Sequence, residues 1–290
     1  MSAAGPPQGA NLAPSGGSAA AKAASVGAHH TSGALHIDSS GDGPSLVLLH
    51  GWAMHSGLWG PLVPRLAQRY RVHAVDLPGH GHSPAPNEFT LDGCVAAVAA
   101  ALAAGEPPHT VLGWSLGGLV AMRWALLEPA MVGRVALVCT SPRFVAGVDW
   151  PHAMSRETLA RFGDELDVAL KPALQRFLAL QLRGSEHGRA TLAAMRRAIF
   201  ARGEPSPAAL RGALVALAGT DLRAEIGAIA QPVLVVSGSR DTLAPADAGR
   251  WLAHRLARAR FVPIADAAHV PFLSHAGAFN AALDRFLDAA

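Results

Sequence analysis

The stretch TVLGWSLGGLVAMRWALL, residues 110–127, places a serine between an apolar strand-like run and a helical run rich in Ala and Leu. Its centre, residues 113–117, has the form G-x-S-x-G, which occurs where a strand turns abruptly into a helix and exposes the serine. Glycines flank the serine because larger side chains would clash with the turn. The motif alone often occurs by chance in a chain with 30 glycines, so the match gains weight only from its strand-turn-helix context. We predict that Ser115 is a nucleophile.

A serine hydroxyl needs a general base, and that base needs an acid to orient it. Asp241 follows the apolar run 233–237, and His269 follows a run that ends at residue 264. Both therefore come just after strand ends, where open parallel sheets bind ligands. The order Ser, Asp, His is one that Ser-His-Asp hydrolases use. We predict that His269 takes the Ser115 proton and that Asp241 orients His269.

Two other carboxylates are rivals for the role of the acid. Asp76 comes before Ser115 in the chain, where we expect it to brace a turn, and Asp266 lies only three residues from His269. Asp241 follows Ser115 in the chain and lies after a late strand of its own, separate from the one that His269 follows, so we prefer Asp241.

Attack on a carbonyl develops negative charge on its oxygen, and two backbone N–H groups can stabilise that charge by about 3 kcal/mol or more. Leu116, directly after the nucleophile, should supply one donor. Trp52, in the segment LLHGW at residues 48–52, should supply the other. The Trp52 indole either walls an acyl pocket or is an ordinary core aromatic, and His50 is expected to be structural.

Short apolar runs alternate with helical patterns from residue 45 onwards, which predicts an α/β fold with a mostly parallel sheet covered on both faces. We expect strands near residues 45–49, 71–75, 110–112, 135–139, 233–237 and 260–263. We expect helices near residues 61–68, 91–104, 116–127, 246–257 and 276–288.

Three regions follow from this alternation. Helical patterns succeed one another over residues 143–212 without a strand, which predicts a helical lid inserted into a core of residues 45–142 and 213–290. Residues 1–44 are rich in Ala, Gly, Ser and Pro and have scarcely a large apolar side chain, so we predict a disordered tail.

The composition, with 50% apolar residues, favours a globular protein and argues against several other classes. No run approaches the roughly 20 apolar residues of a membrane span, and the N-terminal region lacks the apolar core of a secretory signal. We expect a cytoplasmic monomer that binds no membrane.

Cys94 and Cys139 are expected to be buried thiols. His80 and His82 have no third ligand nearby in the sequence, so we predict no metal site.

Positive charge is concentrated in the lid, where residues 143–212 carry a net charge of +4 and the remainder carries −1. Seven basic residues between 171 and 202 are opposed by Glu186 alone. This imbalance indicates either a solvated helical face or a docking surface for an acidic partner. Nucleic acid is a poor candidate because the chain shows no nucleic-acid-binding motif.

From about residue 45 to 290 the chain resembles the α/β-hydrolase superfamily. Six segments are similar to the BioH family of carboxylesterases: LLHGW at 48–52, VDLPG at 75–79, LGWSLGGLV at 112–120, RFLALQ at 176–181, TDLR at 220–223 and AAHVPF at 267–272. That family removes the methyl group from pimeloyl-acyl-carrier-protein methyl ester in biotin synthesis. The resemblance therefore implies a serine carboxylesterase that needs no cofactor.

The resemblance also implies which residues bind the substrate and its carrier. The implied substrate-binding residues are Trp52, Ser115, Leu116, Phe177, Leu178, Ala179, Leu180, Gln181 and His269. A stripe of Leu170, Leu174, Phe177 and Gln181 shares one helical face and suits either an acyl chain or packing against the core. The resemblance further implies that Arg176 and Arg189 dock the acidic acyl carrier protein. Two other basic positions of the family are Pro172 and Ala193 here.

Other functions remain open from the sequence. A general short-chain or aromatic carboxylesterase, a C–C bond hydrolase or a perhydrolase would use the same three catalytic residues. A non-catalytic ligand receptor could keep the same pocket. Dehalogenases and epoxide hydrolases of this fold use an aspartate nucleophile, so Ser115 argues against them.

Overall fold

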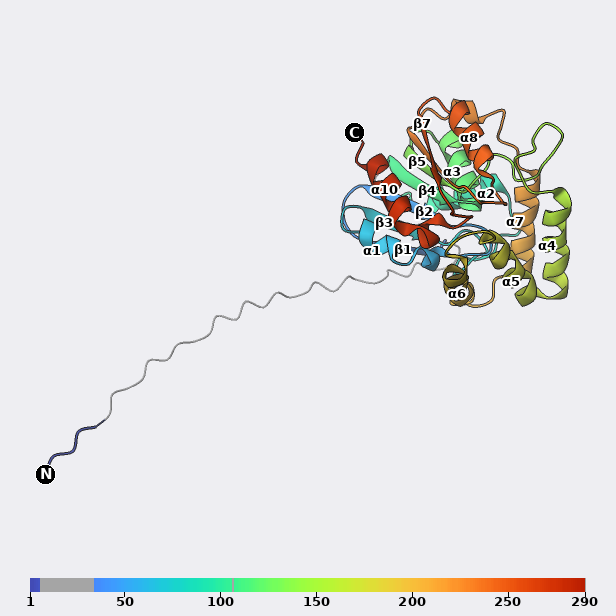
Figure 1. The fold of residues 1–290 in the computed structure, drawn as a ribbon. Helices are drawn as coiled ribbons and strands as arrows, with labels where there is room; N and C mark the ends of the chain where they lie inside the picture. The colour runs from blue at the N-terminus through green and yellow to red at the C-terminus, as the bar shows by residue number, and fades with distance from the viewer. Residues whose placement is uncertain (6–33, 106, 290) are drawn as a thin grey trace.

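The computed structural model describes residues 1–5, 34–105 and 107–289. Its centre is a seven-stranded sheet in the order β1-β3-β2-β4-β5-β6-β7, and Figure 1 shows helices on both sides of it. The strands are β1 (Ile37–Ser40), β2 (Ser45–Leu49), β3 (Arg71–Val75), β4 (His109–Trp114), β5 (Val132–Val138), β6 (Val233–Gly238) and β7 (Ala259–Ile264). The predicted α/β class is confirmed.

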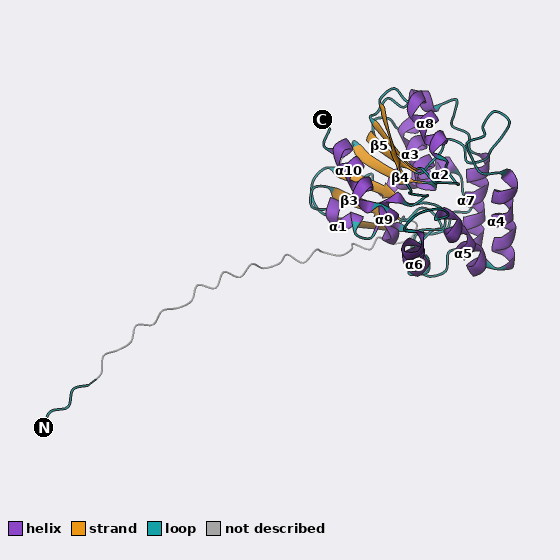
Figure 2. Ribbon diagram, viewed as in Figure 1, coloured by secondary structure: helices purple, strands orange, loops and turns teal. Residues whose placement is uncertain are grey.

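Helices follow each of the strands from β2 to β7, whereas a short turn joins β1 to β2 (Figure 2). In the core they are α1 (Leu62–Leu66), α2 (Leu91–Ala101), α3 (Leu116–Leu127), α8 (Ala246–Arg255), α9 (Pro271–Ser274) and α10 (Ala276–Leu287). Two short 3₁₀ helices, η1 (Ser56–Trp59) and η2 (Ile226–Ala228), lie in loops. Among the described residues, no helix is both long enough and apolar enough to cross a membrane.

Strands β2 to β7 are parallel because helical connections return the chain to the same end of the sheet each time. Every residue of β2 and β6 is buried, as is expected of central strands covered on both faces. The carboxyl ends of β4, β6 and β7 consequently lie along one edge of the sheet. Ser115, Asp241 and His269 follow these three ends.

The prediction of a disordered tail is wrong at Ile37–Ser40, because this segment is strand β1. It pairs antiparallel with β3, with Ile37 opposite Val75. Main-chain hydrogen bonds hold it, so the segment does not need a run of large apolar side chains. Most of the predicted tail, residues 6–33, lies outside the described residues.

Four helices lie between β5 and β6 and form the region predicted as a lid: α4 (Arg156–Val168), α5 (Leu170–Gln181), α6 (Gly188–Ala198) and α7 (Pro207–Gly219). Figure 1 shows them grouped beside the sheet. Helix α7 continues to Gly219, beyond the boundary at residue 212. Helix α4 packs against α5 and α7, and α5 packs against α6. Serine caps start α4 and α7, where Ser155 and Ser206 accept backbone N–H groups.

An ion-pair network joins this helical insertion to the core. Nη1 of Arg202 lies 2.6 Å from Oδ2 of Asp76, which is fully buried, and its Nη2 contacts Asp38. His55 adds a hydrogen bond of 2.7 Å between its Nε2 and the carbonyl of Ala198. Arg202 therefore fastens the insertion to the core and is not part of an open basic surface.

Candidate active site

Ser115 lies at the turn between β4 and α3, in a backbone conformation that few side chains adopt. Its φ is 56° and its ψ is −117°. Neighbouring groups hold this strained conformation: the Ser115 N–H donates to the carbonyl of Val138 at 3.0 Å, and Thr140 Oγ1 donates to the Ser115 carbonyl at 2.8 Å. The sequence reasoning did not identify Thr140, whose only signal is a hydroxyl shortly after strand β5.

The glycines around Ser115 have no room for a side chain. A Cβ on Gly113 would lie 2.3 Å from the carbonyl oxygen of Gly117, and a Cβ on Gly117 would lie 2.1 Å from that of Leu49. Both are backbone contacts that cannot move aside. The crowding predicted for the elbow is therefore present, and it brings the end of β2 against the start of α3.

Asp241 and His269 form a hydrogen-bonded pair on the loops that follow β6 and β7. Nδ1 of His269 lies 2.7 Å from Oδ2 of Asp241. The other carboxylate oxygen accepts the backbone N–H groups of Leu243 at 2.8 Å and Ala244 at 3.1 Å. A carboxylate can only accept hydrogen bonds, so Nδ1 donates its proton and Nε2 keeps a free lone pair. This is the tautomer that a general base needs.

Nε2 of His269 is buried, and no described residue, Ser115 included, hydrogen-bonds to it. The loop of His269 is nevertheless tied to the elbow, because the indole N–H of Trp114 donates to the His269 carbonyl at 2.7 Å. Catalytic hydrogen bonds often tighten only when substrate binds. The structure thus brings the loop of His269 against the residue that precedes Ser115, without a direct hydrogen bond between Ser115 and His269.

The two rival acids are engaged elsewhere. Asp76 accepts the backbone N–H groups of Ser56 at 2.7 Å and His82 at 2.8 Å, besides its ion pair with Arg202. Burial opposes its ionisation, but the neighbouring His50, these donors and Arg202 lower the pKa of Asp76 to about 2. Asp266 pairs with Arg240 at 2.5 Å. Of the three carboxylates, only Asp241 hydrogen-bonds to His269.

The loop after β2 passes directly beside Ser115, as a second oxyanion donor would require. A Cβ on Gly51 would lie 3.2 Å from the Cβ of Ser115. His50 braces this loop: its Nδ1 bonds to the carbonyl of Gly51 at 2.8 Å, while its Nε2 accepts the N–H of Leu77 at 2.9 Å. Burial, followed by the charge of His80, lowers the pKa of His50 to about 3. His50 is therefore a neutral, structural residue.

Leu116 is the first residue of α3, and the N–H groups of a first helical turn have no acceptor within the helix. Its N–H therefore remains available beside Ser115. Trp52 directly follows Gly51, the residue that passes beside Ser115. Its indole N–H donates to the carbonyl of Leu210 in α7 at 2.8 Å, so this side chain connects the core loop to the helical insertion.

Helix α5 covers the site with one of its faces. The ring of Phe177 meets the ring of Trp52 edge to face, with centroids 4.7 Å apart. Phe177, Leu178 and Gln181 are buried, whereas Ala179 is exposed and Leu180 is half-buried. Ala179 thus does not belong to the covered face, whereas Leu180 packs partly against the core. Ser115 is 6% exposed and His269 is 1% exposed, so the insertion closes over the site.

Gln181 joins α5 to the His269 loop and has an unusual side chain. Its backbone carbonyl accepts the N–H of His269 at 3.0 Å. Its amide group is buried, and neither the oxygen nor the nitrogen has a hydrogen-bond partner among the described residues. Buried amides are normally paired. A polar group of a bound ligand would satisfy this one.

The basic residues of α5 and α6 divide into paired and unpaired side chains. Arg176 pairs with Glu165 at 2.9 Å, and Lys171 pairs with Glu204 at 2.5 Å. Four exposed residues have no acidic partner within the described part of the chain: Arg183, Arg189, Arg196 and Arg197. A basic surface therefore remains on this part of the insertion after its internal ion pairs are formed.

The segment at residues 220–223 has a structural role in the fold. Asp221 accepts from Arg223 at 2.7 Å and from Arg143 at 3.3 Å, and Arg223 also pairs with Asp149 at 2.9 Å. The Arg223 guanidinium lies 5.3 Å from the ring centre of Trp150. These contacts join the end of α7 to the loop that precedes α4.

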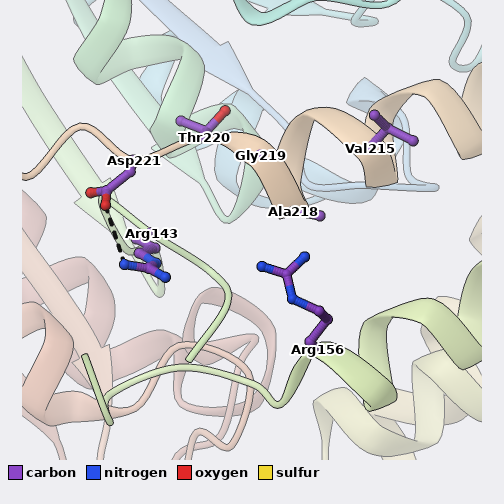
Figure 3. A pocket seen from close by; sticks show the side chains of 7 residues that line it. All are labelled: Arg143, Arg156, Val215, Ala218, Gly219, Thr220 and Asp221. Carbon is purple, nitrogen blue, oxygen red and sulfur yellow. Dashed lines mark hydrogen bonds and ion pairs between the residues drawn. The ribbon is translucent and has the colours of Figure 1, made fainter. Parts of the chain in front are cut away.

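A hollow of about 480 Å³ lies beside this junction. Figure 3 shows Arg143 and Arg156 on one side of it and the last turn of α7 on the other. None of the residues that line it, which are Arg143, Arg156, Val215, Ala218, Gly219, Thr220 and Asp221, belongs to the Ser115 cluster. It is thus separate from the candidate active site.

The serine elbow, the His-Asp pair and the sheet order define a hydrolase of the α/β-hydrolase class. The family model for the alpha/beta hydrolase fold matches residues 44–276. Among solved structures, the enol-lactonase from Burkholderia xenovorans LB400 superposes with a TM-score of 0.76 at 27% identity, covering 88% of this chain and 96% of that one.

Sequence relatives identify one family within the α/β-hydrolase class. The chain is 46% identical over 254 residues to the pimeloyl-[acyl-carrier protein] methyl ester esterase of Xanthomonas axonopodis pv. citri, covering 87% of this chain and 98% of the relative. It is 45% identical to the enzyme of that name from Chromobacterium violaceum, covering 88% and 98%. The chain belongs to the family of the pimeloyl-[acyl-carrier protein] methyl ester esterases.

Proposed function

We propose that this protein is a serine carboxylesterase that hydrolyses the methyl ester of pimeloyl-acyl-carrier protein to methanol and pimeloyl-acyl-carrier protein, in biotin biosynthesis. The observation that carries this proposal is the His269–Asp241 hydrogen bond beside the strained elbow of Ser115. The relatives at 45–46% identity, which span nearly the whole of their own length, support the choice of substrate.

In the proposed mechanism, Oγ of Ser115 attacks the ester carbonyl while Nε2 of His269 takes its proton. The carbonyl oxygen gains negative charge, which the N–H groups of Leu116 and Trp52 stabilise. The intermediate then expels methoxide, to which His269 returns the proton, so methanol leaves and an acyl-serine remains. Asp241 stabilises the imidazolium throughout.

Hydrolysis of the acyl-serine repeats these steps with water. His269 takes a proton from a water molecule while the water oxygen attacks the acyl carbonyl. His269 then returns the proton to Oγ of Ser115. Pimeloyl-acyl-carrier protein is released from the serine with a free carboxylate in place of the methyl ester, and the enzyme returns to its starting state. These residues need no cofactor for either half of the reaction.

The buried face of α5 is suited to the acyl chain. Phe177 and Trp52 offer apolar surface above Ser115, and the unpaired amide of Gln181 offers a hydrogen bond to a polar group of the substrate. Because Ser115 and His269 are covered, α5 and its neighbours must move before an acyl chain can enter. Trp52 would then serve both as oxyanion donor and as pocket wall.

The basic surface of α5 and α6 is suited to an acidic carrier protein. Arg189 and the unpaired Arg183, Arg196 and Arg197 present positive charge beside the helix that covers the site. Arg176 would join them by exchanging Glu165 for a carboxylate of the carrier. These groups would steer the carrier and orient its acyl arm towards the opening.

The proposal is tested with purified wild type and Ser115→Ala on pimeloyl-acyl-carrier-protein methyl ester and on a short p-nitrophenyl ester, with methanol and free acid as products. Serine-dependent turnover of both, with the carrier-bound ester clearly preferred, would support it. Activity on the short ester alone would indicate a general carboxylesterase. Binding without turnover would indicate a receptor.

A further inference from the structure

Three side chains with metal-ligating groups meet at the boundary between the helical insertion and the core. Glu186 and His187 lie in the loop between α5 and α6, and His275 lies between α9 and α10. One ligand atom from each lies within 4.8 Å of the other two. Almost ninety positions separate the first two residues from the third, so only the tertiary fold brings them together.

The hydrogen bonds around His275 define its tautomer. Oγ of Ser274 donates its single proton to the carbonyl of Val270 at 3.0 Å. The same Oγ lies 2.9 Å from Nδ1 of His275, and it can only act as the acceptor in this second bond. Nδ1 of His275 therefore carries the proton, and Nε2 presents a bare lone pair.

That lone pair has no protein partner. Nε2 of His275 is buried, and no described residue hydrogen-bonds to it. In metal-binding histidines one ring nitrogen donates a hydrogen bond to a protein group, and the other nitrogen is unprotonated and binds the metal. The orphaned Nε2 is thus a preoriented ligand rather than a satisfied structural group.

His187 and Glu186 complete the cluster from the side of the insertion. The ring centre of His187 lies 5.1 Å from that of His275. The backbone of His187 is held at the start of α6, where its carbonyl accepts from the N–H of Thr191 at 3.3 Å and from its Oγ1 at 3.0 Å. Glu186 forms no ion pair with a described residue.

We propose that Glu186, His187 and His275 bind a divalent transition-metal ion, with Zn²⁺ as the best fit. Two imidazoles and a carboxylate are zinc ligands, whereas Ca²⁺ and Mg²⁺ prefer oxygen ligands alone. Bonds of about 2.1 Å in tetrahedral geometry place ligand atoms roughly 3.4 Å apart. The exposed side chains of Glu186 and His187 can rotate to close the remaining gap, and water takes the fourth position.

The ion would act as a clamp and would take no part in ester chemistry. His275 follows α9, which begins two residues after His269, and Glu186 and His187 lie five and six residues after Gln181. A metal bond between them would fasten the loop before α6 to the core beside the catalytic histidine. Because a ligand that binds only the closed arrangement stabilises it, Zn²⁺ would hold the insertion shut.

The test uses the full chain, freed of metal with a chelator and titrated with Zn²⁺ against a chromophoric competitor. The variants are His187→Gln, His275→Gln and Glu186→Gln, with His254→Gln, an exposed histidine on α8, as the matched control. We expect His187→Gln and His275→Gln to raise the Kd for one bound Zn²⁺ about tenfold or more. Glu186→Gln should raise it less, and the control should match wild type. The remaining histidines contribute equally to all of these proteins.

Two results would overturn the proposal: no binding by wild type at millimolar Zn²⁺, or identical titrations for wild type, His187→Gln and His275→Gln. Circular dichroism of each variant checks that it is folded. Hydrogen exchange supplies a second measurement, because Zn²⁺ should slow exchange in α6 of the wild type but not of His275→Gln. Equal slowing in both proteins would contradict the clamp.

Discussion

The indole N–H of Trp114 donates to the backbone carbonyl of His269 at 2.7 Å, which joins the residue before the proposed nucleophile to the proposed general base 155 positions later. Both side chains are almost fully buried. The bond sets the position of the His269 loop relative to the elbow, although Ser115 and His269 are not themselves hydrogen-bonded. We therefore expect the proposed catalytic geometry to depend on a side chain that has no chemical role.

Trp114→Phe should lower kcat by roughly tenfold, because the His269 carbonyl loses its donor and the imidazole moves relative to Ser115. It should also lower the free energy of unfolding by about 1–3 kcal/mol. Steady-state kinetics and urea unfolding measure the two effects. Trp251→Phe, on the half-buried face of α8, is the control and should keep wild-type kcat. Equal kcat in both variants would show that the bond does not position the base.

Asp241→Asn should leave the fold intact and lower kcat by about four orders of magnitude, because the amide cannot hold His269 in the required tautomer. The measurement is turnover of a p-nitrophenyl ester at neutral pH. Asp266→Asn is the matched control, since Asp266 pairs with Arg240 and not with His269. If Asp266→Asn lost activity and Asp241→Asn kept it, the roles would have to be exchanged.

Charge reversal on the basic surface should affect only the carrier-bound substrate. Arg176→Glu and Arg189→Glu should each lower kcat/KM for the carrier-bound ester by roughly tenfold at low salt, with a smaller effect at high salt, because screening weakens steering. A p-nitrophenyl ester should be unaffected. Arg258→Glu, at the amino end of β7, is the control. Equal losses on both substrates would indicate a damaged insertion.

His50 should make the fold sensitive to acid. Its pKa is lowered from 6.5 to about 3, first by burial and then by His80, so the folded state keeps the imidazole neutral. Below pH 6.5 the unfolded state binds a proton at this imidazole that the folded state does not bind. The folded state therefore keeps its full stability above pH 6.5 and loses stability as the pH falls from 6.5 towards 3. The free energy of unfolding should therefore decrease by about 2 kcal/mol between pH 7 and pH 5 from this residue alone.

Urea unfolding at a series of pH values measures this dependence. His50→Asn should be less stable at neutral pH, because it loses the bond to the Leu77 N–H, but its stability should change less between pH 7 and pH 5. An unchanged slope in the variant would assign the acid sensitivity to other buried histidines, such as His73, whose pKa burial lowers to about 4.

Gly117→Ala should prevent folding or cost at least about 3 kcal/mol, because its Cβ would lie 2.1 Å from the carbonyl of Leu49. Gly277→Ala, in α10, is the control: no atom lies within 4 Å of its added Cβ, so it should stabilise the protein by about 0.5–1 kcal/mol. Thermal unfolding of both variants makes the comparison. A stable Gly117→Ala would refute the elbow geometry.

The central strands could be predicted from sequence because each is a continuous apolar run between turn signals, and β2 and β3 begin and end at the predicted residues. Helix α3 also has its predicted bounds. Strand β1 could not be predicted, since an edge strand of four mostly polar residues pairs only with β3 and has no apolar run to mark it. Both cysteines are buried thiols, as predicted.

Local sequence by itself determined the elbow, strands β2 to β7 and the order of Ser115, Asp241 and His269, because short-range sterics and hydrophobic periodicity act on neighbouring residues. Only the tertiary structure decided which carboxylate pairs with His269, that Arg202 fastens the insertion to Asp76, and that His275 meets Glu186 and His187. Side-chain pairing depends on distances between segments far apart in the chain. Those distances exist only once the sheet and the helical insertion have packed.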